Sequence, residues 1–331
     1  MKVTLVALAV ALGTVLIAAP RPLIAAPSPL IAARGPLLAA RSPLAAAQGP
    51  PAPGPAAIPG VPVLRVQKNV SMLPGGGGNV TVQAGDDGVL LVDTGGAALT
   101  QGILAAVRSV STRPIHTIIN THLDADHTGG NQAFLKLRGA QPVRVMGHEN
   151  TFNRMIDQAA AANSNIPRDS LPTNTYFTPT RDFFLNGEAI VLHHVEGHTD
   201  GDTLVHFRGS DVVSTGDVFT PDRYPSIDLA NGGSVNGLIA ALNRVLEITV
   251  PARYQEGGTY VIPGHGRLCD EADVVEYRDM VTIVRDRVQE LMRKKMTLAQ
   301  VRAARPSLDY DGEYGNPDAF IDATFRSLGG T

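Results

Sequence analysis

The chain has 331 residues, of which 44% are hydrophobic, and its formal net charge at pH 7 is −3. This length suffices for one large domain or two small ones, and the absence of a basic block gives no indication of nucleic-acid binding. The single cysteine, Cys269, excludes an internal disulfide and a cysteine-rich zinc site. The nine histidines are therefore the side chains to examine as nitrogen ligands.

The first 47 residues are predicted to be a signal peptide and not part of the fold. Residues 1–19 combine Lys2 with an uncharged apolar run that is too short for a comfortable membrane span. A seven-residue repeat, PLIAAPS and its variants, then starts at Pro22, Pro29, Pro36 and Pro43. Proline in every repeat excludes a coiled coil. We interpret the repeats as an expansion of the signal peptide's end, with cleavage favoured after Ala47, although a retained Pro/Ala linker explains them equally well.

Residues 48–60 (QGPPAPGPAAIPG) are predicted to be a linker, because such a sequence cannot form a packed element. A single domain is expected from residue 61 to residue 331. The export signal predicts a periplasmic or secreted protein without stable membrane insertion after cleavage. The oligomeric state stays open at this stage.

Strand patterns and helix patterns alternate along the chain from residue 61 onward. Period-two alternation and short apolar runs predict strands over residues 61–73, 79–85, 88–95, 115–120, 142–147, 189–197, 202–207 and 211–217. Residues 259–266 are predicted to be a strand followed by a loop. Amphipathic spacing predicts helices over residues 97–110, 130–138, 149–162, 234–248 and 273–295, with short helices from Thr297 and Asn316. The proline-rich residues 164–182 are expected to be a loop. The two halves look alike in plan, so we predict two sheets with helices outside, an α/β sandwich.

Acidic and histidine side chains follow several of the predicted strands. The stretch THLDADHTGGN, residues 121–131, places two histidines and two aspartates within six positions. Further strand ends carry Asp93 in VDTG, His198 in GHTDGD, Asp217 in STGD and His265 in PGHG. Ligands at strand ends are held by a rigid scaffold, as a metal site requires. Imidazole and carboxylate groups together suit zinc, iron or manganese.

In their order and gaps, the motifs VDTG, THxDxDHTGGN, GHT, STGD and PGHG resemble the metallo-β-lactamase superfamily over roughly residues 61–270. The resemblance implies a four-layer αββα sandwich with two metal ions at one edge of the paired sheets. It implies one metal ion held by His122, Asp124 and His198, a second held by Asp126, His127 and His265, and Asp217 as the bridge. Asp126 is also predicted to be catalytic, and Asp93 to order the loop behind the ligands.

Such a pair of metal ions, expected to be Zn²⁺ although iron or manganese would also suit the ligands, lowers the pKa of bound water to about 7. A hydroxide nucleophile then exists at neutral pH without a serine or cysteine. We therefore predict an exported metal-dependent hydrolase that acts on the amide, lactone or ester carbonyl of a small molecule, with β-lactams among the candidates.

Asp124 departs from the commonest family pattern, HxHxDH, in which a histidine occupies this position. Three interpretations are open: Asp124 is a ligand in a two-metal site, or it does not reach and only the second metal binds, or the site binds no catalytic metal. The aspartate also resembles nuclease-like members, which makes a phosphodiesterase a rival function, although no basic groove is evident. Two further candidate functions are a di-iron redox protein and a non-catalytic metal-binding protein.

Several further residues are candidates for supporting roles. Gly75–Gly78 lacks the Gly-Lys-Ser/Thr of a phosphate loop, so it is predicted to be a mobile hairpin tip over the cleft. Tyr224 and Asn231 are candidates for substrate contact, and His148 for lining the cleft. Cys269 is expected to be inert. Structural or surface roles are expected for His116, His193, His194 and His206.

Overall fold

The structure is a computed structural model that describes residues 60–137, 142–161 and 166–330, all within one compact unit. The predicted signal peptide and its repeats lie outside the described residues, as does the predicted linker except Gly60. In the part of the chain that is described, no helix is long and apolar enough to cross a lipid bilayer.

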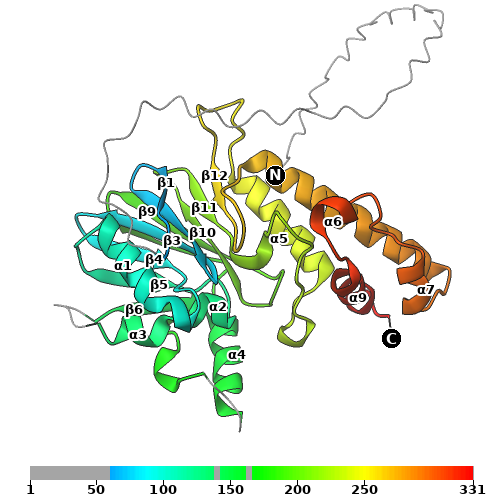
Figure 1. Cartoon of the computed structure of the whole chain (residues 1–331), viewed down its shortest axis with the longest axis horizontal. Helices are drawn as coiled ribbons and strands as arrows, with labels where there is room; N and C mark the ends of the chain where they lie inside the picture. The colour runs from blue at the N-terminus through cyan, green and yellow to red at the C-terminus, as the bar shows by residue number, and fades with distance from the viewer. Residues whose placement is uncertain (1–59, 138–141, 162–165, 331) are drawn as a thin grey trace, which may run out of the picture. The chain divides into compact units, whose positions relative to one another are not determined.

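Two β-sheets form the centre of the fold (Figure 1). Within the described residues the first sheet has seven strands, in the spatial order β1 (Leu64–Gln67), β2 (Val70–Gly76), β3 (Gly78–Gly85), β4 (Gly88–Val92), β5 (Ile115–Ile119), β6 (Arg144–His148) and β7 (Asn174–Tyr176). The second has five, in the order β12 (Tyr260–Ile262), β11 (Val212–Ser214), β10 (Asp202–Phe207), β9 (Glu188–Val195) and β8 (Thr180–Leu185). Strands β4 to β7 run parallel, as do β11 and β12. The carboxyl ends of parallel neighbours lie at one edge of their sheet.

Helices connect the strands and cover the outer face of each sheet. The helices in the first half are α1 (Thr100–Val110), α2 (Ala125–Thr128), α3 (Asn131–Leu135) and α4 (Glu149–Ala160). Those in the second half are α5 (Val235–Ile248), α6 (Glu271–Arg293), α7 (Leu298–Ala303), α8 (Asp311–Tyr314) and α9 (Asp318–Ser327). Short 3₁₀ turns are η1 (Ala97–Leu99), η2 (Arg168–Ser170), η3 (Gly216–Val218) and η4 (Leu229–Asn231).

The alternation of side chains along the strands produces the layers. In β4, Leu90 and Val92 point into a core shared with the second sheet, while Val89 and Leu91 pack with Ile103 of α1. A third core lies between the second sheet and helices α5, α6 and α9. Because alternate side chains of these strands point to opposite faces, each sheet packs on the other sheet with one face and on helices with its other face. The layers are therefore helix, sheet, sheet and helix. The predicted αββα sandwich is confirmed.

One predicted strand and one predicted loop need correction. The single strand predicted over residues 61–73 is instead the antiparallel pair β1 and β2, which turns at Lys68 with φ +46°. No glycine or proline marks that turn, and its sequence signal is the single turn-favouring residue Asn69. The loop predicted over residues 164–182 contains β7 and the start of β8, which are edge strands formed by pairing with β6 and β9.

One polar contact joins α5 to the outer face of the second sheet. Arg244 donates through Nη2 to Nδ1 of His193, at 3.1 Å. Burial, together with the charge of Arg244 and the nearby His206, lowers the pKa of His193 to about 4. His193 is therefore neutral in the folded protein at neutral pH.

This contact predicts a stability loss in mild acid. A histidine whose pKa falls from 6.5 to about 4 on folding contributes stability that is complete above pH 6.5 and is lost as the pH falls towards 4. His193→Gln cannot titrate, so its free energy of unfolding should fall less steeply than that of the wild type between these pH values. Denaturant unfolding at a series of pH values measures this slope. His116→Gln leaves the Arg244 contact intact and should follow the wild type; parallel curves for all three proteins would contradict the assignment.

Candidate metal centre

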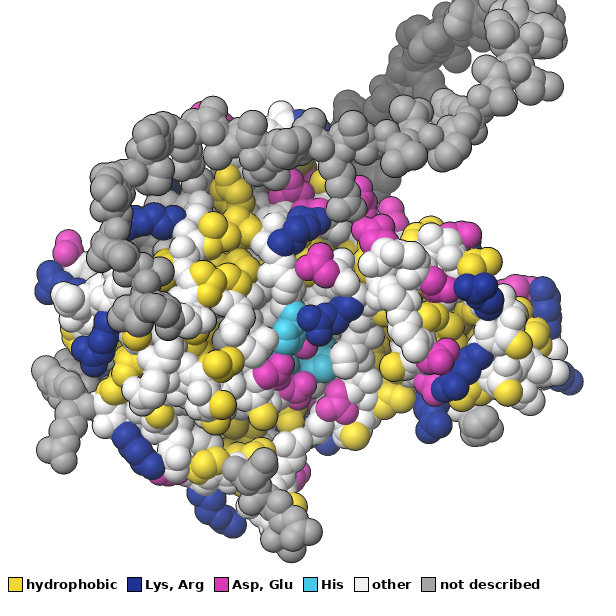
Figure 2. Space-filling model, in the orientation of Figure 1, with side chains coloured by type: hydrophobic (Ala, Val, Ile, Leu, Met, Phe, Trp, Pro, Cys, Tyr) yellow, Lys and Arg dark blue, Asp and Glu magenta, His cyan; other side chains and the backbone are white. Residues whose placement is uncertain are grey.

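Histidine and aspartate side chains from both sheets converge at one edge of the sandwich. Asp93 follows β4, residues 121–127 follow β5, Asp217 follows β11 and His265 follows β12. His198 comes from the loop between β9 and β10. All seven predicted ligands lie within three overlapping groups whose ligand atoms are within 4.8 Å of one another. On one face of the molecule, histidine side chains reach the surface among acidic ones (Figure 2).

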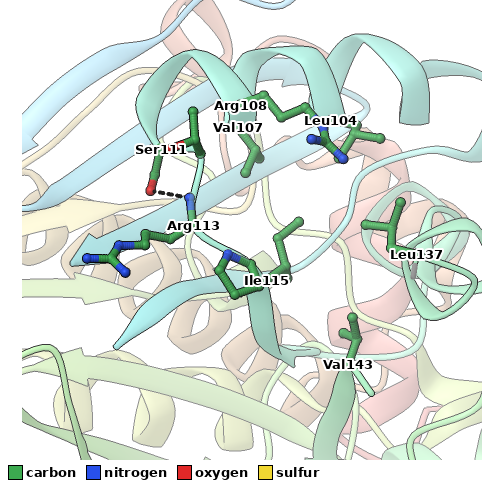
Figure 3. A pocket seen from close by; sticks show the side chains of 10 residues that line it. Leu104, Val107, Arg108, Ser111, Arg113, Ile115, Leu137 and Val143 are labelled. Carbon is green, nitrogen blue, oxygen red and sulfur yellow. Dashed lines mark hydrogen bonds between the residues drawn. The ribbon is translucent and has the colours of Figure 1, made fainter. Parts of the chain in front are cut away.

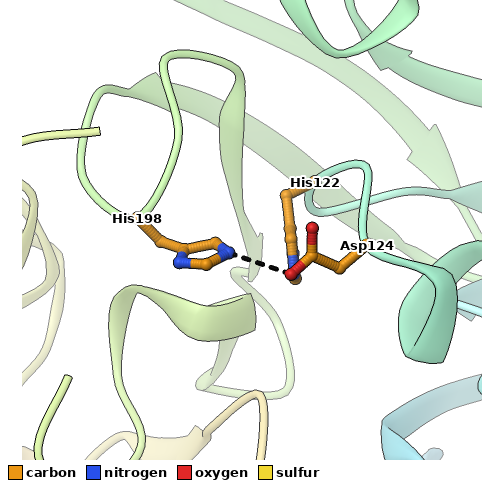
Figure 4. Close-up of side chains that lie close together, drawn as sticks. All are labelled: His122, Asp124 and His198. Atoms are coloured by element: carbon orange, nitrogen blue, oxygen red, sulfur yellow. Dashed lines mark hydrogen bonds and ion pairs between the residues drawn. The ribbon is translucent and has the colours of Figure 1, made fainter. Parts of the chain in front are cut away.

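The first group contains His122, Asp124 and His198 (Figure 4). Oδ2 of Asp124 lies 3.2 Å from Nε2 of His198 and 3.7 Å from Nε2 of His122. Both histidine side chains are almost fully buried, and Asp124 is one-third exposed. Asp124 therefore lies beside both histidines with which the sequence groups it.

The second group contains Asp126, His127 and His265. Nε2 of His265 lies 3.3 Å from Oδ2 of Asp126 and 3.4 Å from Nε2 of His127. Asp126 and His127 lie in the short helix α2, while His265 follows β12 of the other sheet. Packing of the two sheets against each other therefore sets the distance between these ligands.

Asp217 lies between the two groups. Its Oδ1 is 3.2 Å from Nε2 of His127 and 3.5 Å from Nε2 of His265. The same carboxylate also forms a cluster with His122 and His127. A carboxylate that faces both groups has the position of a bridging ligand.

Hydrogen bonds fix the tautomers of three of these histidines. His127 donates through Nδ1 to Asp93, at 2.8 Å, and His198 donates through Nδ1 to the carbonyl of Ser226, at 3.0 Å. The hydroxyl of Thr121 donates to Asp93, so it accepts from Nδ1 of His122 at 2.9 Å. With each Nδ1 committed to an outer partner, Nε2 is the nitrogen that faces the carboxylates in each of these histidines.

The donor set fits divalent metal ions. Nε2 of His122 is buried without a hydrogen-bond partner in the described part of the chain. Such groups are costly unless something else satisfies them. Imidazole nitrogens oriented by outer partners, together with carboxylate oxygens, are the ligands that zinc, iron and manganese take.

The pKa values reflect the concentration of negative charge at the centre. Burial alone would lower the pKa of His198, but the hydrogen bond to Asp124 and the charges of Asp202 and Asp217 raise it to about 9. Hydrogen bonds to Asp126 and Asp217 raise the pKa of His265 to about 9. Burial opposes ionisation of Asp217, but its hydrogen bonds to His127 and His265 outweigh that effect and hold its pKa well below the usual range. The carboxylates are thus ionised and attract a cation.

Asp93 organises the centre from behind. It accepts hydrogen bonds from the backbone and the hydroxyl of Thr121, at 2.8 and 2.7 Å, besides the one from His127. Its backbone has φ +64°, a conformation that costs a non-glycine residue about 1–3 kcal/mol. The structure thus places Asp93 where it can order the loop behind the ligands.

The glycine-rich tip at Gly75–Gly78 lies against the second group. A Cβ at Gly78 would stand 2.4 Å from Cε1 of His127, so no side chain fits there. The next residue, Asn79, donates through Nδ2 to the carbonyls of Pro263 and Gly266, at 2.9 and 3.1 Å, on either side of His265. Asn79 was not among the residues predicted from the sequence, although its position directly after four glycines is distinctive.

Other sequence candidates lie outside the centre. Tyr224 is a wrong prediction as a substrate contact: it is buried, and its hydroxyl donates to Asp311 at 2.9 Å because the C-terminal helices pack over it. Asn231 donates to Asp228 and shapes its own loop. His148 is buried and stacks on another histidine, so it does not line an open cleft. Burial raises the pKa of the Cys269 thiol, which keeps it protonated.

A separate cavity of about 220 Å³ opens at the other end of β5 (Figure 3). Leu104, Arg108, Arg113 and Ile115 are among its lining residues. Ile115 begins β5, whereas His122 and Asp124 of the first group follow the end of that strand. The length of the strand therefore separates this cavity from the metal centre.

An αββα sandwich with histidine and aspartate clusters at one sheet edge defines a class of metal-binding proteins. The model of the metallo-beta-lactamase superfamily matches residues 73–266, and the chain belongs to this superfamily. The superfamily contains metal-dependent hydrolases. No curated protein is significantly similar to the chain in sequence.

Solved structures share the fold at low sequence identity. The inverting sec-alkylsulfatase Pisa1 from Pseudomonas sp. is 16% identical with a TM-score of 0.65, and the match covers 82% of this chain and 50% of that one. This chain thus spans about half the length of that enzyme. A metallo-beta-lactamase from Pontibacter korlensis is 18% identical with a TM-score of 0.54, covering 67% of this chain and 99% of that one. The DIM-1 metallo-beta-lactamase is 17% identical with a TM-score of 0.53, and the match covers 68% of this chain and 98% of that one.

The role of Asp93 can be tested by substitution. Asp93→Asn keeps the shape of the side chain but weakens the hydrogen bonds that it accepts from Thr121 and His127. Metal affinity should therefore fall by about 10–100-fold. Competition with a chelator of known affinity measures this change. Asp86→Asn, in the exposed turn before β4, should leave metal affinity unchanged. Equal affinities for the Asp93 and Asp86 variants would refute the assigned role.

Proposed function

We propose that the protein is an exported hydrolase that uses two zinc ions to cleave an amide, lactone or ester bond in a small molecule. The observation that carries the proposal is the arrangement of His122, His127 and His198. Each commits Nδ1 to a fixed acceptor and turns Nε2 towards a carboxylate, as metal-ligating histidines do. A preorganised centre of this kind is suited to a metal-dependent reaction.

In this proposal, His122, Asp124 and His198 hold the first metal ion, and Asp126, His127 and His265 hold the second, with Asp217 between them. When bound, the two ions supply a hydroxide nucleophile near neutral pH and polarise the oxygen of the substrate's carbonyl group.

Asp126 has a second proposed role, as a proton acceptor. Its side chain is 44% exposed, so one side of the carboxylate faces the solvent from which a substrate arrives. A hydrogen bond from His265 outweighs the opposing effect of burial and lowers the pKa of Asp126, so it is ionised at neutral pH. An ionised, partly exposed carboxylate at the mouth of the centre can accept a proton during the reaction.

The substrate class is the most open part of the proposal. Proteins with the same fold include β-lactamases and a sec-alkylsulfatase, so the fold does not select among amide, ester and sulfate ester bonds. The carboxylate of Asp124 adds a negative charge where many relatives have a neutral histidine. The export part of the proposal rests on the sequence of residues 1–47, and a mature N-terminus at Gln48 would support it.

Activity and metal content together test the proposal. The purified protein should contain up to two equivalents of zinc and hydrolyse at least one of nitrocefin, a lactone and an aryl ester. His122→Ala and Asp217→Ala should each reduce that activity by at least about 100-fold and lower the metal content, because each removes a ligand.

Other results would redirect or end the proposal. Turnover confined to bis-p-nitrophenyl phosphate or to an alkyl sulfate would replace the carbonyl substrate with a phosphate or sulfate ester. Iron accompanied by redox activity would favour a di-iron centre. Less than half an equivalent of any metal, with no turnover of these compounds, would rule out the hydrolase assignment. His116→Ala, at the far end of β5, serves as the control and should retain full activity.

The substitution Asp124→His separates the roles of the first metal position. It restores the commonest family pattern and replaces a charged oxygen ligand with a neutral nitrogen ligand, so zinc affinity at this position should be kept or raised. Elemental analysis and zinc titration measure the effect. Unchanged zinc affinity and activity in both Asp124→His and Asp124→Ala would show that the first metal position does not use residue 124.

A further inference from the structure

His198 is the one ligand of the first group that does not follow β5. It lies in a loop of residues 196–201, here called the His198 loop, which connects β9 to β10. His122 and Asp124 are held by the strand end and by α2. The geometry of the first group therefore depends on what holds the His198 loop against the end of the other sheet.

One side of the His198 loop is held by the segment after Asp217. The backbone N–H of Asp228 donates to the carbonyl of His198 at 2.9 Å, and the carbonyl of Ser226 accepts from its ring. The N–H of Asp200 donates to the carbonyl of Asn231 at 3.0 Å. These contacts reach the loop from the second half of the chain.

The other side is held by the first turns of α4. Arg154 donates through Nη2 to Oδ2 of Asp200 at 2.7 Å, and Asn150 donates through Nδ2 to the carbonyl of Asp200 at 2.8 Å. The hydroxyl of the fully buried Thr151 donates to the carbonyl of Gly201 at 2.7 Å. Three side chains spaced along one face of α4 thus bind two consecutive residues of the loop.

The contact between α4 and the loop is close. A Cβ at Gly201 would stand 2.5 Å from Oγ1 and 2.6 Å from the backbone nitrogen of Thr151, so only glycine fits there. The approach brings the loop backbone directly onto the helix. A small displacement of α4 therefore moves the loop with it.

A pair of stacked histidines connects the same loop residue to the start of α4. His194 of β9 donates through Nε2 to the carbonyl of Asp200 at 2.8 Å. Its ring stacks on that of His148, with centroids 3.5 Å apart and the planes 6° from parallel. His148 caps α4 by accepting from the backbone of Asn150. Asp200 is thus tied to β9, to the beginning of α4 and to its second turn.

From these contacts we infer that Asn150, Thr151 and Arg154 are positioning residues that set the affinity of the first metal position through the His198 loop. The inference rests on the proposed two-metal centre and deepens it. It predicts a selective effect, because the second group, Asp126, His127 and His265, has no member in the loop. Loosening the contacts of α4 should weaken the binding of the first metal ion and leave the binding of the second unchanged.

Thr151→Val and Arg154→Ala test the inference. Thr151→Val keeps the volume of the side chain and removes only the hydroxyl, and Arg154→Ala removes the ion pair with Asp200. Each should lower the affinity for one zinc equivalent by about 10–100-fold and leave the second equivalent as in the wild type. Zinc titration of the purified protein in competition with a chromophoric chelator resolves the two equivalents. Asn153→Ala, exposed on the same helix, is the matched control and should titrate like the wild type.

A double substitution identifies which metal ion is affected. His198→Ala already disables the first position, so adding Arg154→Ala to it should change zinc binding no further. Arg154→Lys retains the charge and should recover part of the affinity. Thermal unfolding of each metal-free variant shows that it is folded, and Thr151→Val carries the test if Arg154→Ala is not.

Two failures are distinguishable. A wild-type protein that binds no zinc contradicts the proposed function itself. Suppose instead that the wild type binds two zinc equivalents, and that Thr151→Val and Arg154→Ala either bind both with unchanged affinity or lose affinity equally for both. That result overturns the positioning role of α4 and leaves the proposed function standing.

Discussion

The carboxylate of Asp93 is the constraint on which the centre depends. It accepts hydrogen bonds from the backbone N–H and the hydroxyl of Thr121 and from the ring of His127. This one side chain therefore fixes both the start of the segment that carries the ligands and the orientation of His127. Its left-handed backbone conformation is unfavourable, and its three hydrogen bonds in a buried environment offset that cost. Thr121 in turn orients His122, so the effect of Asp93 extends to the first group.

The two sheets divide the ligands between them, and their packing creates the centre. The first sheet contributes the segment after β5, while the second contributes His198, Asp217 and His265. A close-packed core between the sheets, with Leu90 and Val92 among its members, keeps the two edges in register. Loops from both halves then complete the site: Asn79 holds the segment around His265, and α4 holds the loop that carries His198.

Much of the fold was predictable because its signals are local. Apolar runs and amphipathic spacing identify β4, β5, α5 and α6, and the motifs after the strands place the acids and histidines at strand ends. The turn at Lys68 was missed because it contains no glycine or proline, and lysine rarely adopts the left-handed conformation found there. The edge strand β7 was hidden by neighbouring prolines, and it exists through pairing with β6. Tyr224 was misjudged because its burial depends on helices almost a hundred residues further along the chain.

The sequence by itself determined the kinds of ligand, their order and their attachment to strand ends, because those properties follow from residue identity and short-range periodicity. Tertiary structure alone decided which groups face one another. His127 and His265 are 138 positions apart in the chain, yet their ring nitrogens lie 3.4 Å apart. The same holds for Arg154 and Asp200, whose ion pair joins a helix of one half to a loop of the other. Such contacts arise when two sheets bury their apolar faces together, and no local pattern encodes the resulting distances.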